Sequence, residues 1–309
     1  MLQNKALAVV SEVRRAIVGK DTVICKALMA ILARGHILLE DNPGVGKTTL
    51  ALAFSKTMGL SYNRIQFTPE VMPADVVGFS VWDKHTGEFT YRPGAVLCNL
   101  FLADELNRAT SRTQSALLEA MEEGQVTVDG VSHPVPQPFL VIATQNPAGA
   151  SGTQLLPDSQ MDRFMVRLSI GYPAPADEVA MVRRRQGANP LNHVGQVLDL
   201  EGLRELRDRA DRVYVSDEVL DYVIRLVNAT RSHPMIVQGA SPRASLALTA
   251  MSKATALAVG RDYVNPEDVA AVFADVITHR LILSPRAQAE GGFHPAAEIL
   301  RQVPAPTVR

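Results

Sequence analysis

Cysteine is scarce in this chain, with only Cys25 and Cys98 among 309 residues. Two thiols cannot build a disulfide framework, so their number indicates buried thiols in a reducing compartment, and we expect a cytoplasmic protein. The seven histidines do not cluster at the spacing of metal ligands, and neither cysteine has a neighbouring set of Cys or His residues. No zinc site is therefore predicted.

An uninterrupted apolar run long enough to cross a membrane is also missing. A spanning helix needs roughly 18 or more such residues, and no stretch of the sequence reaches that length. Near the N-terminus a short apolar stretch is soon followed by Glu12, Arg14 and Arg15, which favours an amphipathic helix over a signal peptide. We therefore expect no membrane span.

Neither sign of charge is in excess. Lys and Arg total 31 and Asp and Glu total 32, which gives a formal net charge of −1. Such a balance argues against a chain that holds nucleic acid by charge alone. Hydrophobic residues make up 47% and charged residues 20%, which is typical of a folded globular protein. At roughly 100–200 residues per domain, the length predicts about two domains.

The composition changes near residues 171–178, which read GYPAPADE. We predict a domain boundary there, with one domain over residues 1–172 and a second over residues 173–309. Before the boundary, short apolar runs alternate with helical patterns, which predicts an α/β domain whose parallel sheet is covered on both faces. After it, nearly every segment is helical. The predicted strands are residues 36–40, 62–67, 100–103 and 139–144.

Capping residues mark the expected helices. Asp21 is a plausible N-cap for residues 21–34, and Ser111 opens a helix with Gln114 at capping-box spacing. In the second half, the expected caps are Ser216, Ser241 and Asn265. Two segments instead predict β-hairpins, residues 79–91 and residues 126–135, the second around the turn pair Asp129-Gly130.

The most specific motif is LLEDNPGVGKTTLA, which lies between a predicted strand and a predicted helix. Glycines there let backbone N–H groups surround phosphates, Lys47 would reach the β- and γ-phosphates, and the Thr48 hydroxyl would bind Mg²⁺. The usual phosphate-loop pattern has glycine where this chain has Asp41, and a glycine-rich turn is the simpler alternative. The residues expected to bind nucleotide are Asn42, Pro43, Gly44, Val45, Gly46, Lys47, Thr48 and Thr49.

A pair of carboxylates, Asp104 and Glu105, ends another apolar strand, 57 residues after Lys47. Carboxylates at the carboxyl end of a parallel strand face the crevice where ligands bind. Asp104 is expected to hold Mg²⁺ through water, and Glu105 to orient or deprotonate the attacking water. Many strands end in solvated carboxylates, so the pair alone is a weak signal. The phosphate-loop motif upstream is what makes it a candidate catalytic pair.

Three further polar residues are candidates. Asn146 follows an apolar strand, so it is expected beside Asp104, where an amide can bind the γ-phosphate or the attacking water; an Asn-Pro turn is the alternative. Arg163 in MDRF would ordinarily be a surface charge. Arg243 lies on the first turn of a predicted helix, where a cation opposes the macrodipole. An anionic partner would explain that placement, and a solvated arginine is the alternative.

In series, these motifs resemble those of the MoxR family, in the helix-2-insert group of AAA+ ATPases. The resemblance covers the chain from Asn4 to about Pro304, and an acidic residue commonly replaces the first loop glycine in that family. The segments that carry it are EDNPGVGKT, QFTPEVMPADVVG, FLADELNRA, TQSALLEAMEEGQVTVDG, VIATQNP and LPDSQMDRF.

The resemblance implies a role for each candidate. Asn146 corresponds to sensor 1, Arg163 to an arginine finger that acts on the neighbouring subunit, and Arg243 to sensor 2 of a helical lid domain. The pair Val18 and Gly19 corresponds to the region beside the adenine. The two hairpins correspond to the helix-2 insert, at about residues 75–95, and the pre-sensor-1 insert, at about residues 125–136.

The function that the resemblance implies is hydrolysis of MgATP to ADP between the subunits of a ring, usually a hexamer. Family members are thought to remodel protein partners as chaperones do, often partners with a von Willebrand factor A domain. One alternative is an ATP-gated scaffold without hydrolysis, which the intact Glu105 disfavours. A DNA-remodelling motor is weakly disfavoured by the balanced charge. A GTPase is disfavoured because the Asn146 motif lacks NKxD, and no acceptor pocket for a kinase is evident.

Overall fold

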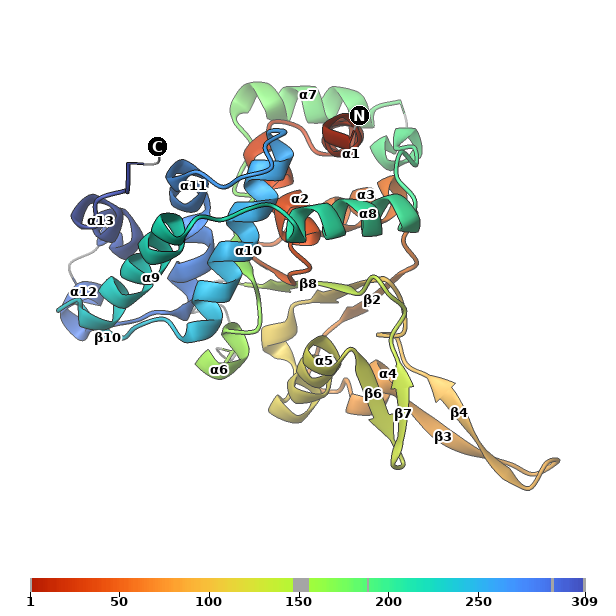
Figure 1. Cartoon of the computed structure of the whole chain (residues 1–309). Helices are drawn as coiled ribbons and strands as arrows, with labels where there is room; N and C mark the ends of the chain where they lie inside the picture. The colour runs from red at the N-terminus through yellow and green to blue at the C-terminus, as the bar shows by residue number, and fades with distance from the viewer. Residues whose placement is uncertain (1, 147–155, 188, 290–291, 308–309) are drawn as a thin grey trace.

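A five-stranded parallel sheet forms the centre of the first half of the chain in the computed structural model, which describes residues 2–146, 156–187, 189–289 and 292–307 (Figure 1). The strand order is β2-β5-β8-β1-β9, so consecutive strands are joined by crossovers. The strands are β1 (Ile37–Glu40), β2 (Tyr62–Gln66), β5 (Leu100–Asp104), β8 (Leu140–Gln145) and β9 (Val166–Leu168). The predicted parallel sheet is confirmed, and β9 is a strand that the sequence analysis missed.

The central strands are apolar on both faces because two cores lie on either side of them. Every residue of β5 and β8 is buried. Alternate side chains point to opposite faces, so Leu102 and Ile142 join one core while Phe101 and Val141 join the other. This double burial explains why the strands read as continuous apolar runs.

Helices from the first half cover both faces of the sheet (Figure 1). The core that contains Leu102 also contains residues of α1, α2 and α3, and the core that contains Phe101 contains residues of α4 and α5. These helices are α1 (Leu2–Ala16), α2 (Asp21–Leu32), α3 (Lys47–Thr57), α4 (Pro73–Val77) and α5 (Ser111–Glu123), with a 3-10 turn η1 (Leu106–Arg108) before α5.

Two antiparallel hairpins project from the α4 and α5 side of the sheet (Figure 1). They are formed by β3 (Gly78–Asp83) with β4 (Glu88–Pro93) and by β6 (Gln125–Val128) with β7 (Val131–Pro134). Both hairpins were predicted, and Asp129 and Gly130 have the positive φ values that a tight turn needs. The rings of Tyr91 and His133 stack 3.7 Å apart, which joins one hairpin to the other.

The second half is mostly helical, as predicted. Its elements are α6 (Asp158–Met161), α7 (Pro175–Arg185), η2 (Pro190–His193), α8 (Leu200–Asp211), α9 (Asp217–Ser232), α10 (Pro242–Ala258), α11 (Pro266–Ile277), η3 (Thr278–Arg280), α12 (Pro285–Ala289) and α13 (Pro295–Gln302). A short antiparallel pair, β10 (Ile236–Gln238) and β11 (Ile282–Leu283), departs from the all-helical expectation. One continuous core includes α1, α2 and α10, so the division at residue 172 stays a prediction.

The caps differ from expectation at two helices. Asp21 is the first residue of α2 rather than its cap, and it pairs with Arg14 at 2.9 Å. Thr110, not Ser111, caps α5, because its extended backbone lets its hydroxyl accept the Thr113 N–H. Gln114 instead donates to main-chain carbonyls ahead of the helix. The caps at Ser216, Ser241 and Asn265 are confirmed.

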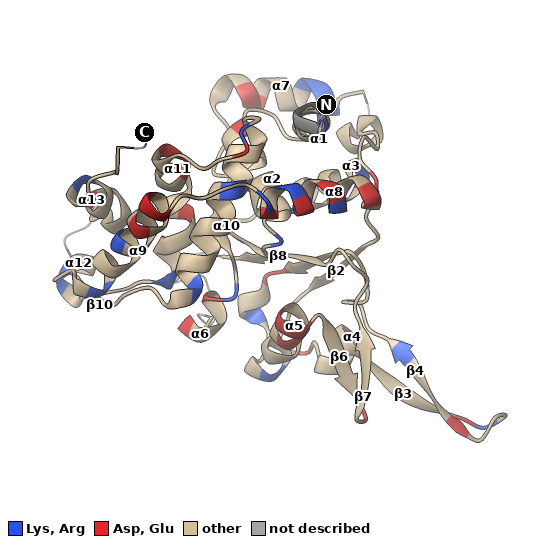
Figure 2. Cartoon of the chain, viewed as in Figure 1, with Lys and Arg blue, Asp and Glu red and all other residues tan. Residues whose placement is uncertain are grey.

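Charged residues of both signs are interspersed along the helices (Figure 2). In this view α8 carries Lys or Arg residues directly beside Asp or Glu residues. Within the residues that the structure describes, no helix is both long and apolar enough to cross a membrane.

His36 is held as a neutral ring inside the fold. Its Nδ1 accepts the Val141 N–H at 3.0 Å, so Nε2 carries the proton that it donates to the Met121 carbonyl at 3.2 Å. Burial lowers the pKa of His36 from 6.5 to about 4. Burial also lowers the pKa of His279, which lies beside the Arg280 guanidinium.

These shifts predict acid sensitivity. Below pH 6.5 the unfolded chain gains protons that the native histidines do not take up until the pH is much lower. The unfolding free energy should therefore be fully retained above pH 6.5 and should fall by up to about 3 kcal/mol for His36 alone as the pH drops to 4. Urea unfolding across this range measures the slope. His36→Gln, which does not titrate, should give a shallower slope than wild type, and an equal slope would contradict the assignment.

Candidate functional site

A cavity of about 270 Å³ opens where the carboxyl ends of β1, β5 and β8 meet the start of α3. Its walls are formed by predicted site residues from three separate segments of the chain. They are Pro43, Gly44, Gly46, Lys47, Thr48, Thr49, Asp104, Glu105 and Asn146. The carboxyl edge of a parallel sheet is where α/β proteins bind their ligands, so this cavity is the candidate site.

The loop between β1 and α3 depends on two glycines with left-handed backbone conformation. Gly44 has φ 86° and Gly46 has φ 101°. Nothing lies within 4 Å of a Cβ built on Gly44, so the backbone conformation and not lack of space requires glycine there. Helix α3 starts at Lys47, immediately after Gly46, and its N-terminus therefore lies at the cavity, where it favours anions.

Asp41 explains the departure from the usual loop pattern. Its buried carboxylate accepts hydrogen bonds from the Ser169 hydroxyl at 2.7 Å and from the N–H groups of Ile170 and Gly171 at 2.6 and 3.0 Å. The loop is thereby attached to the chain that leaves β9. A glycine at this position could not make these contacts.

Lys47 is buried at the base of the cavity, and its ammonium donates to the main-chain carbonyl of Asp41 at 2.6 Å. Burial lowers the pKa of Lys47, an effect that the carboxylates of Asp41, Asp104 and Glu105 oppose. These nearby negative charges favour the protonated amine, which is the form that binds phosphate.

The Asp104 carboxylate is held on both oxygens. One accepts from Arg64 at 2.6 Å, and the other accepts from the Thr144 hydroxyl at 2.6 Å. Arg64 lies on β2 and Thr144 on β8, the two strands that flank β5. Neither residue is predicted from the sequence, because the pairing of β5 with these strands cannot be derived from local spacing.

Glu105 adopts a left-handed backbone conformation, with φ 56° and ψ 44°. Its N–H donates to the Thr144 hydroxyl at 2.9 Å, its carboxylate accepts from Arg108 at 2.9 Å, and the Asn146 amide approaches the other carboxylate oxygen at 3.4 Å. A non-glycine residue in this conformation costs on the order of 1–3 kcal/mol and is typical of functional sites. Arg108 was missed, although its spacing of three from Glu105 is visible in the sequence.

Thr48 and Asp104 line the same cavity. Hydroxyl and carboxylate oxygens are the ligands that Mg²⁺ prefers, usually together with water and substrate phosphates. The donor set present therefore fits a magnesium ion. The strand ends bring Asn146 beside Glu105, whereas the neighbour expected from the sequence is the preceding residue, Asp104.

Six predicted residues do not line this cavity: two from the loop, two from the link between α1 and α2, and two arginines. Asn42 and Val45 belong to the loop, but the Asn42 amide donates to the Tyr172 hydroxyl at 3.4 Å and Val45 packs against the core. Val18 and Gly19 lie in the link between α1 and α2, where Gly19 has φ 68° and borders the Asp177 carboxylate. Their position beside an adenine stays a prediction.

Arg163 and Arg243 also lie outside the phosphate-loop cavity. Both line a second cavity of about 400 Å³, between the end of α5, the segment after α6 and the start of α10. Each pairs with Glu122, Arg163 at 3.0 Å. The structure thus brings the two arginines together in a cavity whose lining includes no residue of the phosphate loop.

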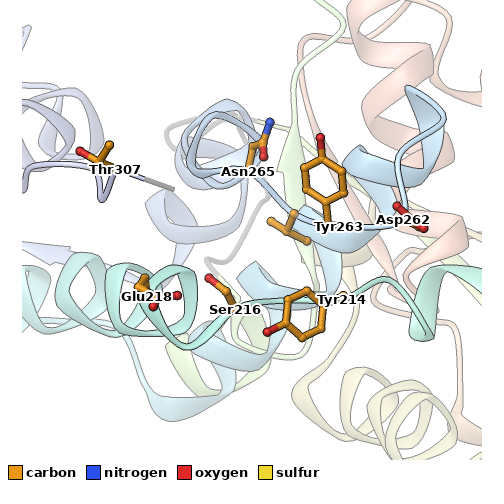
Figure 3. A pocket seen from close by; sticks show the side chains of 8 residues that line it. Tyr214, Ser216, Glu218, Asp262, Tyr263, Asn265 and Thr307 are labelled. Carbon is orange, nitrogen blue, oxygen red and sulfur yellow. The ribbon is translucent and has the colours of Figure 1, made fainter. Parts of the chain in front are cut away.

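The largest of the described cavities, about 890 Å³, lies on the second half of the chain (Figure 3). It contains none of the predicted site residues. Ser216 and Asn265 on its wall already serve as caps of α9 and α11, and Tyr214 and Tyr263 are joined by a backbone bridge. Because it contains none of the predicted site residues and two of its polar side chains already serve as helix caps, it is not the candidate site.

Comparison with known families and structures agrees with this geometry. Residues 36–166 match the family model "ATPase family associated with various cellular activities (AAA)", and residues 228–303 match the model "AAA lid domain". A crystal structure of a protein from Cytophaga hutchinsonii superposes with a TM-score of 0.91, at 39% identity, over 99% of this chain and 96% of the other. The sheet, the loop and the helical second half thus define an AAA domain with its lid.

Two sequence relatives narrow the class. YeaC of Bacillus subtilis is 43% identical over 282 residues, which cover 91% of this chain and 88% of that protein. Chaperone MoxR1 of Mycobacterium tuberculosis is 42% identical over 288 residues, which cover 90% of this chain and 76% of that protein. The chain belongs to the MoxR family of AAA+ ATPases.

The anchoring role of Asp41 can be tested by substitution. Asp41→Ala leaves the N–H groups of Ile170 and Gly171 without their acceptor, so the unfolding free energy should fall by about 2–4 kcal/mol. Asp41→Asn retains one acceptor oxygen and should lose less. Urea unfolding provides the measurement, with Glu88→Ala on the exposed hairpin as the control that should change little. Equal stability of Asp41→Ala and wild type would rule out this role.

Proposed function

We propose that this chain hydrolyses MgATP to ADP and phosphate at the interfaces of a homohexameric ring and uses the cycle to remodel or assemble a protein partner. The observation that carries the proposal is the convergence of Lys47, Asp104, Glu105 and Asn146 on one cavity at the N-terminus of α3. Membership of an ATPase family supports nucleotide binding at this cavity.

Within the cavity each group has a distinct task. The backbone N–H groups of residues 44–49 and the Lys47 ammonium bind the phosphates. The Thr48 hydroxyl and, through water, Asp104 would hold Mg²⁺, which would neutralise charge at the phosphates. The conformation of the loop depends on Asn42, Pro43 and Val45. The adenine ring of the nucleotide is proposed to lie beside Val18 and Gly19.

Glu105 is the group that activates water. Its left-handed backbone turns the side chain out of the strand direction, and the Asn146 amide lies at its carboxylate. We infer that Glu105 accepts the proton of the attacking water while Asn146 orients that water or the γ-phosphate. Arg108 pairs with this carboxylate at 2.9 Å and so holds its orientation.

Arg163 and Arg243 are proposed to act on the nucleotide of the neighbouring subunit. Two features support action in trans: both side chains lie outside the cavity of their own chain, and both remain partly exposed. Guanidinium groups offset the negative charge that spreads over the γ-phosphate oxygens. In such an interface, one face of a subunit binds a different face of the next subunit. Repeated head to tail, this kind of contact closes into a ring.

A protein partner is proposed on the basis of the β3–β4 hairpin and the relatives. Phe79, Trp82 and Phe89 on this hairpin are 50%, 51% and 71% exposed, and the rings of Trp82 and Phe89 contact edge to face. Exposed aromatic residues are enriched at protein interfaces. A similar chain is named a chaperone. The family resemblance suggests a partner with a von Willebrand factor A domain, and we propose that the two proteins meet in the cytoplasm.

The first test separates binding from turnover. Lys47→Ala removes charge that the phosphates contact before reaction, so it should weaken ATP binding. Glu105→Gln keeps the side-chain shape but removes the base, so it should retain binding and reduce turnover by about 10²–10⁴-fold. Phosphate release and equilibrium nucleotide binding measure the two effects. Glu119→Gln, an exposed carboxylate on α5, is the control. Wild-type turnover by Glu105→Gln would refute the assigned base.

The second test addresses action between subunits. Arg163→Ala should reduce turnover on the order of 10³-fold, and the ATPase rate per subunit of wild type should rise with protein concentration as rings assemble. Mixed with Lys47→Ala chains, Arg163→Ala chains should regain activity, because the intact Arg163 of one variant meets the intact loop of the other. Co-assembly without any recovery would count against a finger that acts in trans.

A further inference from the structure

Glu122, near the end of α5, lies between the two arginines assigned to the neighbouring nucleotide. One carboxylate oxygen, Oε2, pairs with an amino nitrogen of Arg163 at 3.0 Å, and the other, Oε1, accepts from an amino nitrogen of Arg243. The sequence separation between Glu122 and Arg243 is 121 residues. A single carboxylate thus bridges a residue after α6 and a residue on the first turn of α10.

The backbone segments that carry the arginines are fixed by a separate set of contacts. Asp162, next to Arg163, accepts from the Ser241 hydroxyl at 2.8 Å and from the buried Arg280 at 2.7 Å. Ser241 is the cap of α10, two residues before Arg243. Asp162 therefore fixes where the two side chains start, while Glu122 fixes where their charged ends lie.

Each arginine uses only one amino nitrogen in the contact with Glu122. The same nitrogen of Arg163 also donates to the Leu118 carbonyl at 2.7 Å. Among the described residues, neither guanidinium has another hydrogen-bond or ion-pair partner. An arginine has five N–H donors in a planar fork, so each keeps donors for an incoming anion while it stays in place.

Charge and exposure make this arrangement suitable for positioning. The exposed fractions are 30% for Arg163, 52% for Arg243 and 34% for Glu122, so the three groups can be reached from outside the chain. Without the carboxylate, two like charges would repel and two long side chains would regain rotamer freedom. Ion pairs this exposed add little to folding stability, so the effect of Glu122 falls on arginine orientation.

We propose that Glu122 is a positioning residue that holds Arg163 and Arg243 as a pair, with their free N–H groups directed at the γ-phosphate of the adjoining subunit. This inference rests on the proposed action of the arginines in trans. The role assigned to Glu122 is to contact the two arginines and not the nucleotide. With Glu122 included, the three side chains carry a net positive charge, which an incoming phosphate neutralises.

The experiment compares Glu122→Ala and Glu122→Gln with wild type in assembled rings. Loss of the bridge should lower kcat on the order of tenfold to a hundredfold, as expected for misplaced catalytic groups. KM for ATP should change less than about twofold, because the loop of the same chain is intact, and the thermal midpoint should be nearly unchanged. Glu122→Gln should lie between wild type and Glu122→Ala. Glu123→Gln, exposed on the next residue, is the matched control and should behave as wild type.

Two further measurements separate positioning from a structural effect. In an Arg163→Ala/Arg243→Ala background, Glu122→Ala should lower kcat no further, because residues that act as a unit are not additive. In mixed rings, Glu122→Ala chains should regain activity from Lys47→Ala chains. A full additional loss without the arginines, or a wild-type kcat in both Glu122 variants, would overturn the inference while leaving the trans arginines standing. A wild-type chain without ATPase activity would overturn the proposed function and this inference together.

Discussion

The buried carboxylate of Asp41 connects the loop after β1 to the chain that leaves β9, and the candidate site depends on that connection. This connection fixes the position of the first residue of the loop, and the main-chain carbonyl of Asp41 accepts a hydrogen bond from the Lys47 ammonium. The two left-handed glycines then carry the chain into α3. The other walls of the cavity are formed by residues at the ends of β5 and β8, so the site forms only where these neighbouring strands end side by side.

Ion pairs between arginine and carboxylate hold three of the acidic residues discussed above. Asp104 pairs with Arg64, Glu105 with Arg108, and Glu122 with two arginines at once. Each pair holds a flexible charged group in one orientation, which lowers the entropy lost when a ligand arrives. The carboxylates of Asp104 and Glu105 line the cavity, whereas the Glu122 cluster lies on the face proposed to meet the next subunit. These ion pairs orient their side chains more than they stabilise the fold, because partly exposed ion pairs contribute little to the free energy of folding.

Much of the fold could be predicted because local patterns determine it. Strands buried on both faces give apolar runs, and the segment around Lys47 combines strand, glycines and helix start in one motif. Strand β9 is not predicted from the sequence, because its three residues are too few to show a period. The α5 cap is predicted one residue too late, at Ser111, because Thr110 and Ser111 are both suitable caps by type. Arg64 and Glu122 were missed because their partners are distant in sequence and meet only through strand order and lid packing.

The stack of Tyr91 on His133 has a mechanical consequence. Rings 3.7 Å apart and nearly parallel make the two hairpins one body, and the Tyr91 hydroxyl adds a hydrogen bond to the Val77 carbonyl at the end of α4. The second hairpin is in turn continuous with α5, which follows Glu105 through η1. Because the hairpins extend away from the sheet (Figure 1), a small rotation of α5 at the sheet edge would displace their tips further than it displaces the helix itself.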